Sequence, residues 1–230
     1  MVCYFKTSPE IIQIAVMMYV RYPLSLRNVE DLLYERGIDV SHESIRLWVD
    51  QFGNVFARMI RKRRPHALRQ ITHWRWHLDE MLVKIAGETY YLWRAIDHGG
   101  EVLEAYVTKT RDKATSLKFL KKAMKRYGNL KAIVTDGLAS YGAAMKDISN
   151  EDKRETGRYQ NNRIESSHLP FRRRERAMLR FRRRPHLQKV ASTHTSIYNY
   201  FNVQCHLSSR PIVKANRENA LQEWRSLTAA

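Results

Sequence analysis

The sequence predicts a mainly α-helical domain followed by an α/β domain. Between positions 8 and 56 the apolar residues recur at helical spacing, whereas from position 74 onward short extended segments alternate with turns. The length of 230 residues suits one small domain and one of medium size. We therefore expect residues 1–60 to form the all-α domain, 61–73 a basic linker, 74–205 the α/β domain and 206–230 a C-terminal tail.

The all-α region carries clear signals for where its helices begin and end. The stretch "SPE" at residues 8–10 combines a capping hydroxyl, a proline in the first turn and an acid, which favours a helix start. A second helix is expected at about 25–36, because Gly37 follows it as a stop signal. Ser41 is expected to cap a third helix, whose apolar face would contain Ile45, Trp48, Val49 and Phe52.

Two short helices joined by a glycine turn have the shape of a helix-turn-helix. A small helical bundle has the same pattern, so the charge of the chain decides between the two interpretations. Lys and Arg total 41 against 23 acids, a formal net charge of +18, which favours a polyanionic partner such as DNA over a merely well-solvated basic surface. The side chains expected to point away from the apolar face, and so to contact DNA, are those of His42, Glu43 and Arg46.

The sequence pattern of the α/β region predicts three strands, then a helix and then a fourth strand. The strands are expected at 74–85, 90–97, 101–108 and 130–137, with a helix at 112–128 whose inward residues would be Ala114, Leu117, Leu120 and Met124. The helix is long enough to return the chain parallel to the first strand. This order describes a ribonuclease-H-like core of the integrase type, built on a mixed five-stranded sheet.

Three acids occupy places in this topology where they could meet. Asp79 lies on the first strand and Asp136 at the end of the fourth, and these strands are neighbours in such a sheet. Two like charges near each other in a sheet are costly unless a cation neutralises them, and oxygen ligands favour Mg²⁺ or Mn²⁺. Glu165, at the start of a later helix, would complete a site for two ions. Each acid has an alternative interpretation: one of Asp79 and Glu80 could face solvent, Asp136 could belong to a turn or helix cap, and Glu165 could pair with an arginine at the surface.

The quoted motifs resemble a known family. Asp79 in "WHLDE", Asp136 in "VTDG" and Glu165 in "NNRIESSH", with Arg172 seven residues later, resemble the DDE transposases of bacterial insertion sequences. The segments "RGIDVSHESIRLW" and "YYLWRAID" are similar to the insertion-sequence-six family in particular. The resemblance spans residues 8–205. It implies that the three acids are catalytic metal ligands and that the helix-turn-helix recognises terminal inverted repeats. His168 matches a family position and is expected either to contact the scissile phosphate or to be a histidine on the helix surface. Arg172 is expected to hold a DNA phosphate.

The expected partners follow from this assignment. They are double-stranded DNA, as terminal inverted repeats and as target, and further copies of the chain in a homodimer or larger assembly. The sequence shows no secretory signal, no apolar run of membrane-spanning length and no disulfide or zinc pattern. We therefore expect the protein to be cytoplasmic and associated with the nucleoid. The alternative functions are a non-catalytic DNA-binding regulator or inactive transposase, and a ribonuclease or resolvase on the same fold.

Overall fold

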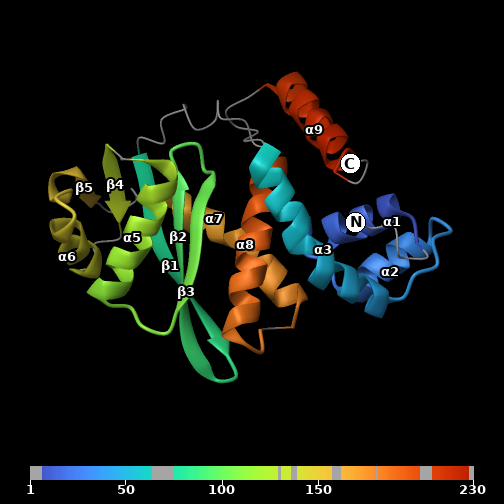
Figure 1. Cartoon of the computed structure of the whole chain (residues 1–230), viewed down its shortest axis with the longest axis horizontal. Helices are drawn as coiled ribbons and strands as arrows, with labels where there is room; N and C mark the ends of the chain where they lie inside the picture. Colours follow the sequence, from blue (N-terminus) through green and yellow to red (C-terminus); the bar gives the residue numbers. More distant parts are fainter. Residues whose placement is uncertain are drawn as a thin grey trace. The chain divides into compact units, whose positions relative to one another are not determined.

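The computed structural model describes residues 7–63, 75–128, 131–135, 139–156, 162–179, 181–202 and 209–227 (Figure 1). These residues divide into two compact units. The helical unit takes the described parts of 1–64, 173–179 and 196–230, and the α/β unit takes those of 65–172 and 180–195. Helices α7 (Asn162–Ala177) and α8 (Arg184–Phe201) each belong partly to one unit and partly to the other. Neither unit is therefore the single continuous stretch that the sequence predicted.

The helical unit begins with three helices at the expected positions. They are α1 (Pro9–Arg21), α2 (Leu26–Tyr34) and α3 (His42–Arg63). Ser8 caps α1, and Ser25 forms a reciprocal capping box with Asn28 at the start of α2. Gly37 has a φ of +74°, the left-handed conformation that a glycine after a helix end adopts readily. The helix start at Ser8 and the stop at Gly37, both predicted from the sequence, are confirmed.

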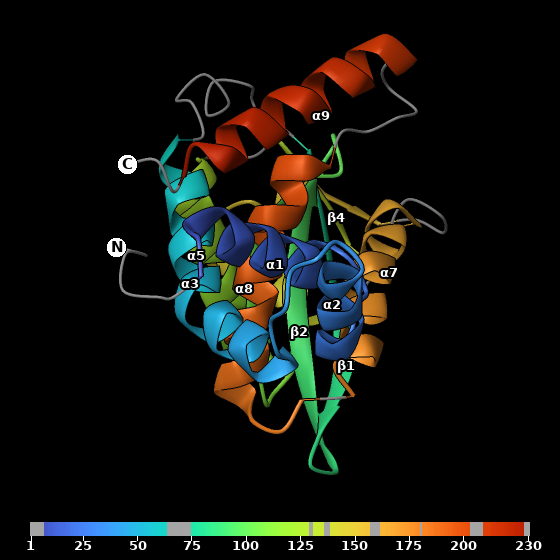
Figure 2. The same ribbon diagram turned by 90° about the vertical axis from the view of Figure 1, so that its right-hand side faces the viewer.

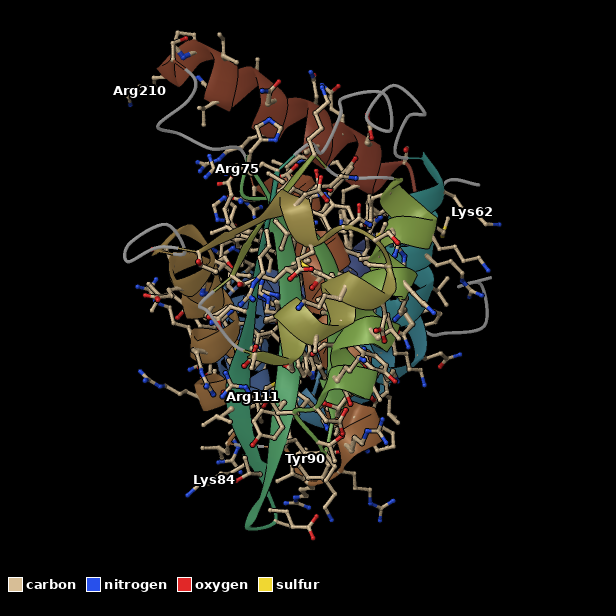
Figure 3. All side chains as sticks on the ribbon, turned by 90° about the vertical axis from the view of Figure 1, so that its left-hand side faces the viewer. Lys62, Arg75, Lys84, Tyr90, Arg111 and Arg210 are labelled. Carbon is tan, nitrogen blue, oxygen red and sulfur yellow. The ribbon has the colours of Figure 1, made fainter. Side chains whose placement is uncertain are left out.

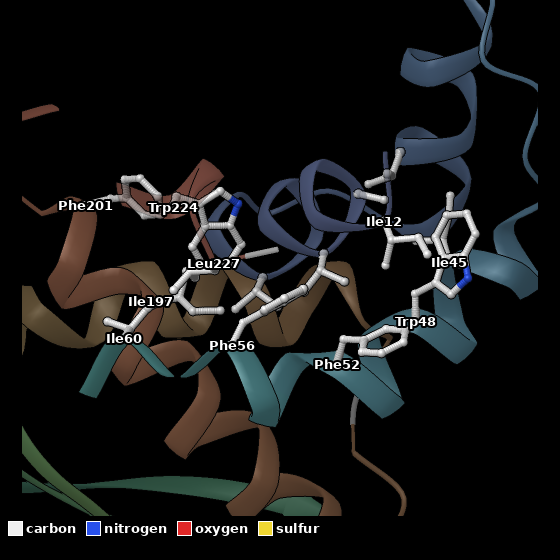
Figure 4. Packing of buried hydrophobic residues seen from close by; sticks show 14 of the residues in the cluster. Ile12, Ile45, Trp48, Phe52, Phe56, Ile60, Ile197, Phe201, Trp224 and Leu227 are labelled. Carbon is white, nitrogen blue, oxygen red and sulfur yellow. The ribbon is translucent and has the colours of Figure 1, made fainter. Parts of the chain in front are cut away.

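Two parts of the helical unit differ from the sequence prediction. Helix α3 continues to Arg63, so residues 61–63 are helical, and the remainder of the predicted linker lies outside the described residues. Residues 210–225, predicted as part of a tail, form helix α9 (Arg210–Arg225). Trp224 of α9 is only 1% exposed because it packs against Phe56 and Phe201 (Figure 4).

The core of the helical unit combines residues from distant parts of the chain. The apolar stripe of α3 continues two turns beyond Phe52, which explains why the helix is longer than predicted. The buried residues labelled in Figure 4 are Ile12, Ile45, Trp48, Phe52, Phe56, Ile60, Ile197, Phe201, Trp224 and Leu227. Segments from both ends of the chain and from the end of α8 therefore share one apolar cluster.

A buried arginine also stabilises this unit. Arg174 is 2% exposed, and its Nη1 atom donates to the carbonyl oxygens of Tyr19, Tyr22 and Leu24 at distances of 2.6–2.8 Å. Its guanidinium also lies 4.1 Å from the centroid of the Tyr19 ring. The last carbonyls of a helix have no intrahelical donor, so Arg174 supplies hydrogen bonds to the C-terminal end of α1 and the turn that follows.

The α/β unit is built on a mixed sheet with the strand order β3-β2-β1-β4-β5. The strands are β1 (Arg75–Ile85), β2 (Glu88–Asp97), β3 (Val102–Thr108), β4 (Ala132–Thr135) and β5 (Arg154–Thr156). β1, β2 and β3 pair antiparallel, whereas β4 is parallel to both β1 and β5. This arrangement confirms the mixed five-stranded sheet.

One face of the sheet packs against α5 (Lys113–Tyr127) and α6 (Ala139–Asp147); in Figure 1, α5 lies in front of the strands and α6 at the left, near β5. A short 3₁₀ turn, η1 (Glu151–Lys153), leads from α6 into β5. The inward face of α5 contains Ser116, Phe119, Leu120 and Ala123. The predicted inward face was wrong only at Ala114, which is exposed; Leu120 is fully buried, and Leu117 and Met124 are partly buried and pack against the core.

The first two strands form a long hairpin that extends past the other strands (Figure 2). Its turn places Ala86 and Gly87 at φ values of 51° and 86°, the positive values of a type I′ hairpin turn. β4 pairs with β1 only over Arg75–His77, so β4 leaves the rest of that edge of β1 unpaired. An isolated bridge from Ile85 to Phe181 contacts the far end of this edge.

Candidate active site

Two adjacent acids in β1 face opposite sides of the sheet, because successive strand residues alternate. Glu80 shares the α5/α6 face with Leu78, and its side chain is only 2% exposed. Its Oε2 atom accepts a hydrogen bond of 3.1 Å from the hydroxyl of Tyr141, and its other oxygen forms an ion pair with Arg111, which is labelled in Figure 3. Glu80 is therefore a buried structural acid, so of the two adjacent acids it is not the one that faces solvent.

Asp79 lies on the opposite face, towards α7. Its side chain is 17% exposed, its Oδ1 atom accepts a hydrogen bond of 2.9 Å from the backbone N–H of Glu80, and its Oδ2 atom lies 3.8 Å from Nδ1 of His168. In the antiparallel register, Asp79 is directly opposite Arg94 of β2. The carboxylate is thus partly open to solvent.

His168 is neutral in this environment. Burial, followed by the positive charges of Arg94 and Arg172, lowers the pKa of His168 to about 3. Its contact with Asp79 at neutral pH is therefore between an uncharged ring and a carboxylate rather than an ion pair. Nε2 of His168 is buried and has no hydrogen-bond partner among the described residues.

Glu165 belongs to the first turn of α7, where a negative charge interacts favourably with the helix dipole. Its side chain is exposed, whereas the neighbouring Ile164 is fully buried and packs with Ile96 and Val102. The apolar neighbour fixes the rotation of this turn on the sheet. Glu165 and His168 are three residues apart, so the spacing that puts them on one side of the helix could be read from the sequence.

The third predicted acid, Asp136, lies outside the described residues. It follows Thr135, the last residue of β4, directly in the sequence. Among the described residues, no three side chains of the His, Cys, Asp and Glu types form a group able to hold a metal ion. The carboxylate of Asp79 is partly exposed and that of Glu165 is exposed, so both offer oxygen atoms of the kind that hard cations prefer, whereas the imidazole of His168 does not.

The residues predicted to contact DNA have intramolecular partners in this structure. Nδ1 of His42 lies 2.9 Å from a carboxylate oxygen of Glu30 in α2. Arg46 donates to Glu43 at 2.7 Å and lies 3.6 Å from Asp50, and its side chain is 47% exposed. These acids raise the pKa of Arg46, first through the hydrogen bond to Glu43.

Arg172 has a structural partner that the sequence did not indicate. Its Nη2 atom donates to the carbonyl oxygen of Leu82 at 2.5 Å, on the part of β1 that β4 does not pair with. Such a contact protects an exposed strand edge. The DNA-phosphate role of Arg172 remains a prediction.

The sheet order, together with an aspartate in the middle of β1 and a glutamate in the first turn of α7, defines a ribonuclease-H-like core of the integrase type. A family model described as a DDE domain, DDE_Tnp_IS240, matches residues 73–204. The chain belongs to this family of DDE transposases, and the resemblance to insertion-sequence transposases is confirmed.

The chain is also similar to individual transposases. It is 32% identical over 170 residues to a Staphylococcus aureus transposase for the insertion sequence-like element IS431mec, covering 72% of this chain and 74% of the relative. It is 31% identical to the Staphylococcus aureus transposase for IS257 in transposon Tn4003, again over 72% of this chain and 74% of the relative. Among solved structures, the HTLV-2 integrase catalytic core in complex with magnesium aligns with a TM-score of 0.43 and 14% identity, over 59% of this chain and 90% of that chain.

Across the described parts of the chain, no helix combines the length and the apolar character that crossing a membrane requires.

Proposed function

We propose that this chain is the transposase of an insertion sequence, which binds the terminal inverted repeats of its element and performs metal-dependent DNA strand cleavage and strand transfer. The observation that carries the proposal is the position of Asp79, a partly exposed carboxylate on the face of β1 that looks towards the helix bearing Glu165. Membership of the DDE family and the net charge of +18 support the same conclusion.

In this proposal Asp79, Asp136 and Glu165 hold two divalent ions, Mg²⁺ or Mn²⁺. Bound metal would polarise the scissile phosphate and lower the pKa of the attacking hydroxyl. The three carboxylates would fix the position of the reacting phosphate, and His168 would approach it as a neutral donor or acceptor because its pKa is about 3. Arg172 would add a positive charge near the DNA backbone.

The helix-turn-helix of α2 and α3 would recognise the inverted repeats. His42, Glu43 and Arg46 lie in the first turns of α3, where a recognition helix contacts base edges. Because Arg46 pairs with Glu43 and Asp50 in the free protein, binding a base would require it to exchange at least one of these partners. Joining two element ends to one target requires two active sites, so we also propose a homodimer or larger assembly on DNA.

The direct test compares substrates. The purified chain with Mg²⁺ is incubated with a duplex carrying the element's terminal repeat, a scrambled duplex, an RNA–DNA hybrid and a four-way junction. The proposal expects cleavage at the boundary of the repeat and little cleavage of the others. Preferred cleavage of the hybrid or the junction would instead indicate a ribonuclease or a resolvase, and binding without any cleavage would indicate a regulator or an inactive transposase.

DNA recognition has its own test. Replacing Arg46 with Ala should weaken binding to the terminal repeat by about 1–3 kcal/mol if the guanidinium contacts a base edge. Arg58, an exposed arginine further along α3, provides the matched control, and Arg58→Ala should change affinity equally for all sequences or not at all. Unchanged affinity and sequence preference in Arg46→Ala would remove this residue from the recognition surface.

A further inference from the structure

Arg94 is a buried arginine beside the candidate site for which the sequence suggested no role. It lies in β2 and is 2% exposed. It is the cross-strand partner of Asp79, and cross-strand partners project from the same face of a sheet. A buried guanidinium is costly unless its hydrogen bonds are satisfied, so the groups that it binds are informative.

One of those groups is the backbone of α7. Nη1 of Arg94 donates to the carbonyl oxygen of Ser167 at a distance of 2.7 Å. This carbonyl lies between Glu165 and Pro170 on the same helix. The contact therefore connects the strand opposite Asp79 with the helical turn that bears Glu165.

That turn needs support, because Pro170 lies inside α7. A proline has no N–H group, so it cannot donate to the carbonyl four residues earlier, and its ring crowds that carbonyl, which here belongs to Ser166. Two side-chain donors act on the weakened turn: the hydroxyl of Ser167 donates to the carbonyl of Ile164 at 2.7 Å, and Arg94 donates to Ser167. Ile164, buried against Ile96 and Val102, adds an apolar anchor.

We propose that Arg94 is a positioning residue that fixes the Glu165 turn of α7 on the Asp79 face of the sheet. This inference rests on the proposed function only where it gives Glu165 a catalytic role. The hydrogen bond that holds α7 to Arg94 is a property of the fold. An alternative is that Arg94 acts simply as a positive charge beside Asp79. A lysine at this position would keep that charge, but its shorter side chain would not reach the Ser167 carbonyl in the same geometry.

The first measurement is amide hydrogen exchange of the full chain, followed in peptides that cover residues 162–172. Arg94→Met should increase exchange in this segment about tenfold, because a charge-assisted hydrogen bond to the turn is lost. Arg184→Met is the matched control, since Arg184 also donates to a backbone carbonyl, that of Val107, at 3.1 Å. The control should leave exchange in 162–172 unchanged. If Arg94→Met does not fold, Arg94→Lys provides the same comparison.

The second measurement is the Mg²⁺ concentration that gives half-maximal cleavage of the terminal-repeat duplex. In Arg94→Met and Arg94→Lys it should rise by about 10–100-fold, the usual effect of losing a residue that orients a metal ligand. Arg184→Met should keep the wild-type value. A merely structural role would lower the melting temperature without changing the metal requirement.

The outcomes separate the two proposals. A wild-type chain that does not cleave contradicts the proposed function, while the exchange data still decide whether Arg94 anchors α7. Unchanged exchange in residues 162–172 of Arg94→Met would overturn the positioning role. The positioning role would also be overturned if Arg94→Lys had the exchange and the Mg²⁺ requirement of the wild type, because a positive charge alone would then be sufficient.

Discussion

The two faces of strand β1 treat adjacent acids in opposite ways. On the α5/α6 face, Glu80 is almost fully buried, pairs with Arg111 and accepts a hydrogen bond from Tyr141. On the α7 face, Asp79 is partly exposed, accepts a hydrogen bond from the backbone N–H of Glu80 and lies 3.8 Å from the neutral ring of His168. The comparison teaches that a carboxylate buried beside an arginine and a tyrosine hydroxyl stabilises the fold, whereas a carboxylate that stays partly exposed on the other face is accessible to a ligand.

The largest expected effect concerns the α7 face. Glu165→Gln should reduce cleavage of terminal-repeat DNA by about a thousandfold or more, because loss of a metal ligand removes several kcal/mol of transition-state stabilisation. The exposed side chain makes a small contribution to folding, so the free energy of unfolding should stay within about 0.5 kcal/mol of wild type. Asp136→Asn should give the same kinetic result.

Cleavage kinetics and urea denaturation of the same preparation check this prediction. Glu175→Gln, a change of a second glutamate in α7, serves as the control. If Glu165→Gln cleaved DNA at the wild-type rate, Glu165 would not be a catalytic residue, and the proposed difference between the two faces of β1 would be contradicted.

The next effect concerns the α5/α6 face. Glu80→Ala should lower the free energy of unfolding by about 2–3 kcal/mol, because it leaves Arg111 and the Tyr141 hydroxyl without their shared partner. Removing one partner of a fully buried ion pair costs roughly 3–5 kcal/mol. The loss expected here is at or below this range because the Arg111 side chain can be rehydrated. Chemical denaturation measures this change. Unaltered stability would show that the buried pair is not structural.

A smaller effect on the same face comes from Tyr141→Phe. It removes one neutral donor while Glu80 keeps its ion pair with Arg111, so unfolding should become easier by about 1 kcal/mol. Cleavage by the folded protein should be unchanged. Denaturation and cleavage assays on this variant check the prediction. A loss of cleavage activity without a loss of stability would contradict the assignment of the Glu80 face to folding.

The order of β1, β2, β3, α5 and β4 could be predicted from the sequence because turns and periodicity are local signals, whereas the positions of α6 and β5 were not predicted. The faces of the helices were harder to predict. In α5 the inward face also contains Phe119 and Ala123, which were not predicted, whereas Ala114, which was predicted to be inward, is exposed. α9 was missed although Pro211 marks its first turn and Val213, Ala220 and Trp224 recur at helical spacing, because its many charged residues obscured the stripe.

The arginine run at positions 172–174 shows why the environment of charged residues could not be predicted. Arg172 donates to the carbonyl of Leu82, Arg173 is exposed, and Arg174 is buried beneath the backbone that follows α1. Each step along a helix rotates the side chain by about 100°, so neighbours in sequence meet different surroundings. Composition shows only that this segment is basic, and tertiary contacts decide which of its arginines are buried.

The central claim is that Asp79 serves chemistry while Glu80 serves folding, and paired measurements on Asp79→Asn and Glu80→Gln test it most directly. Cleavage of terminal-repeat DNA in Mg²⁺ and the free energy of unfolding are measured for both proteins, with DNA binding as a check on integrity. We predict that Asp79→Asn loses cleavage by about a thousandfold or more while keeping its stability and its DNA binding. Glu80→Gln should lose stability but, at equal folded fraction, cleave at close to the wild-type rate. An Asp79→Asn protein that nicks terminal-repeat DNA at a near wild-type rate, with contaminating nuclease excluded, would contradict the account.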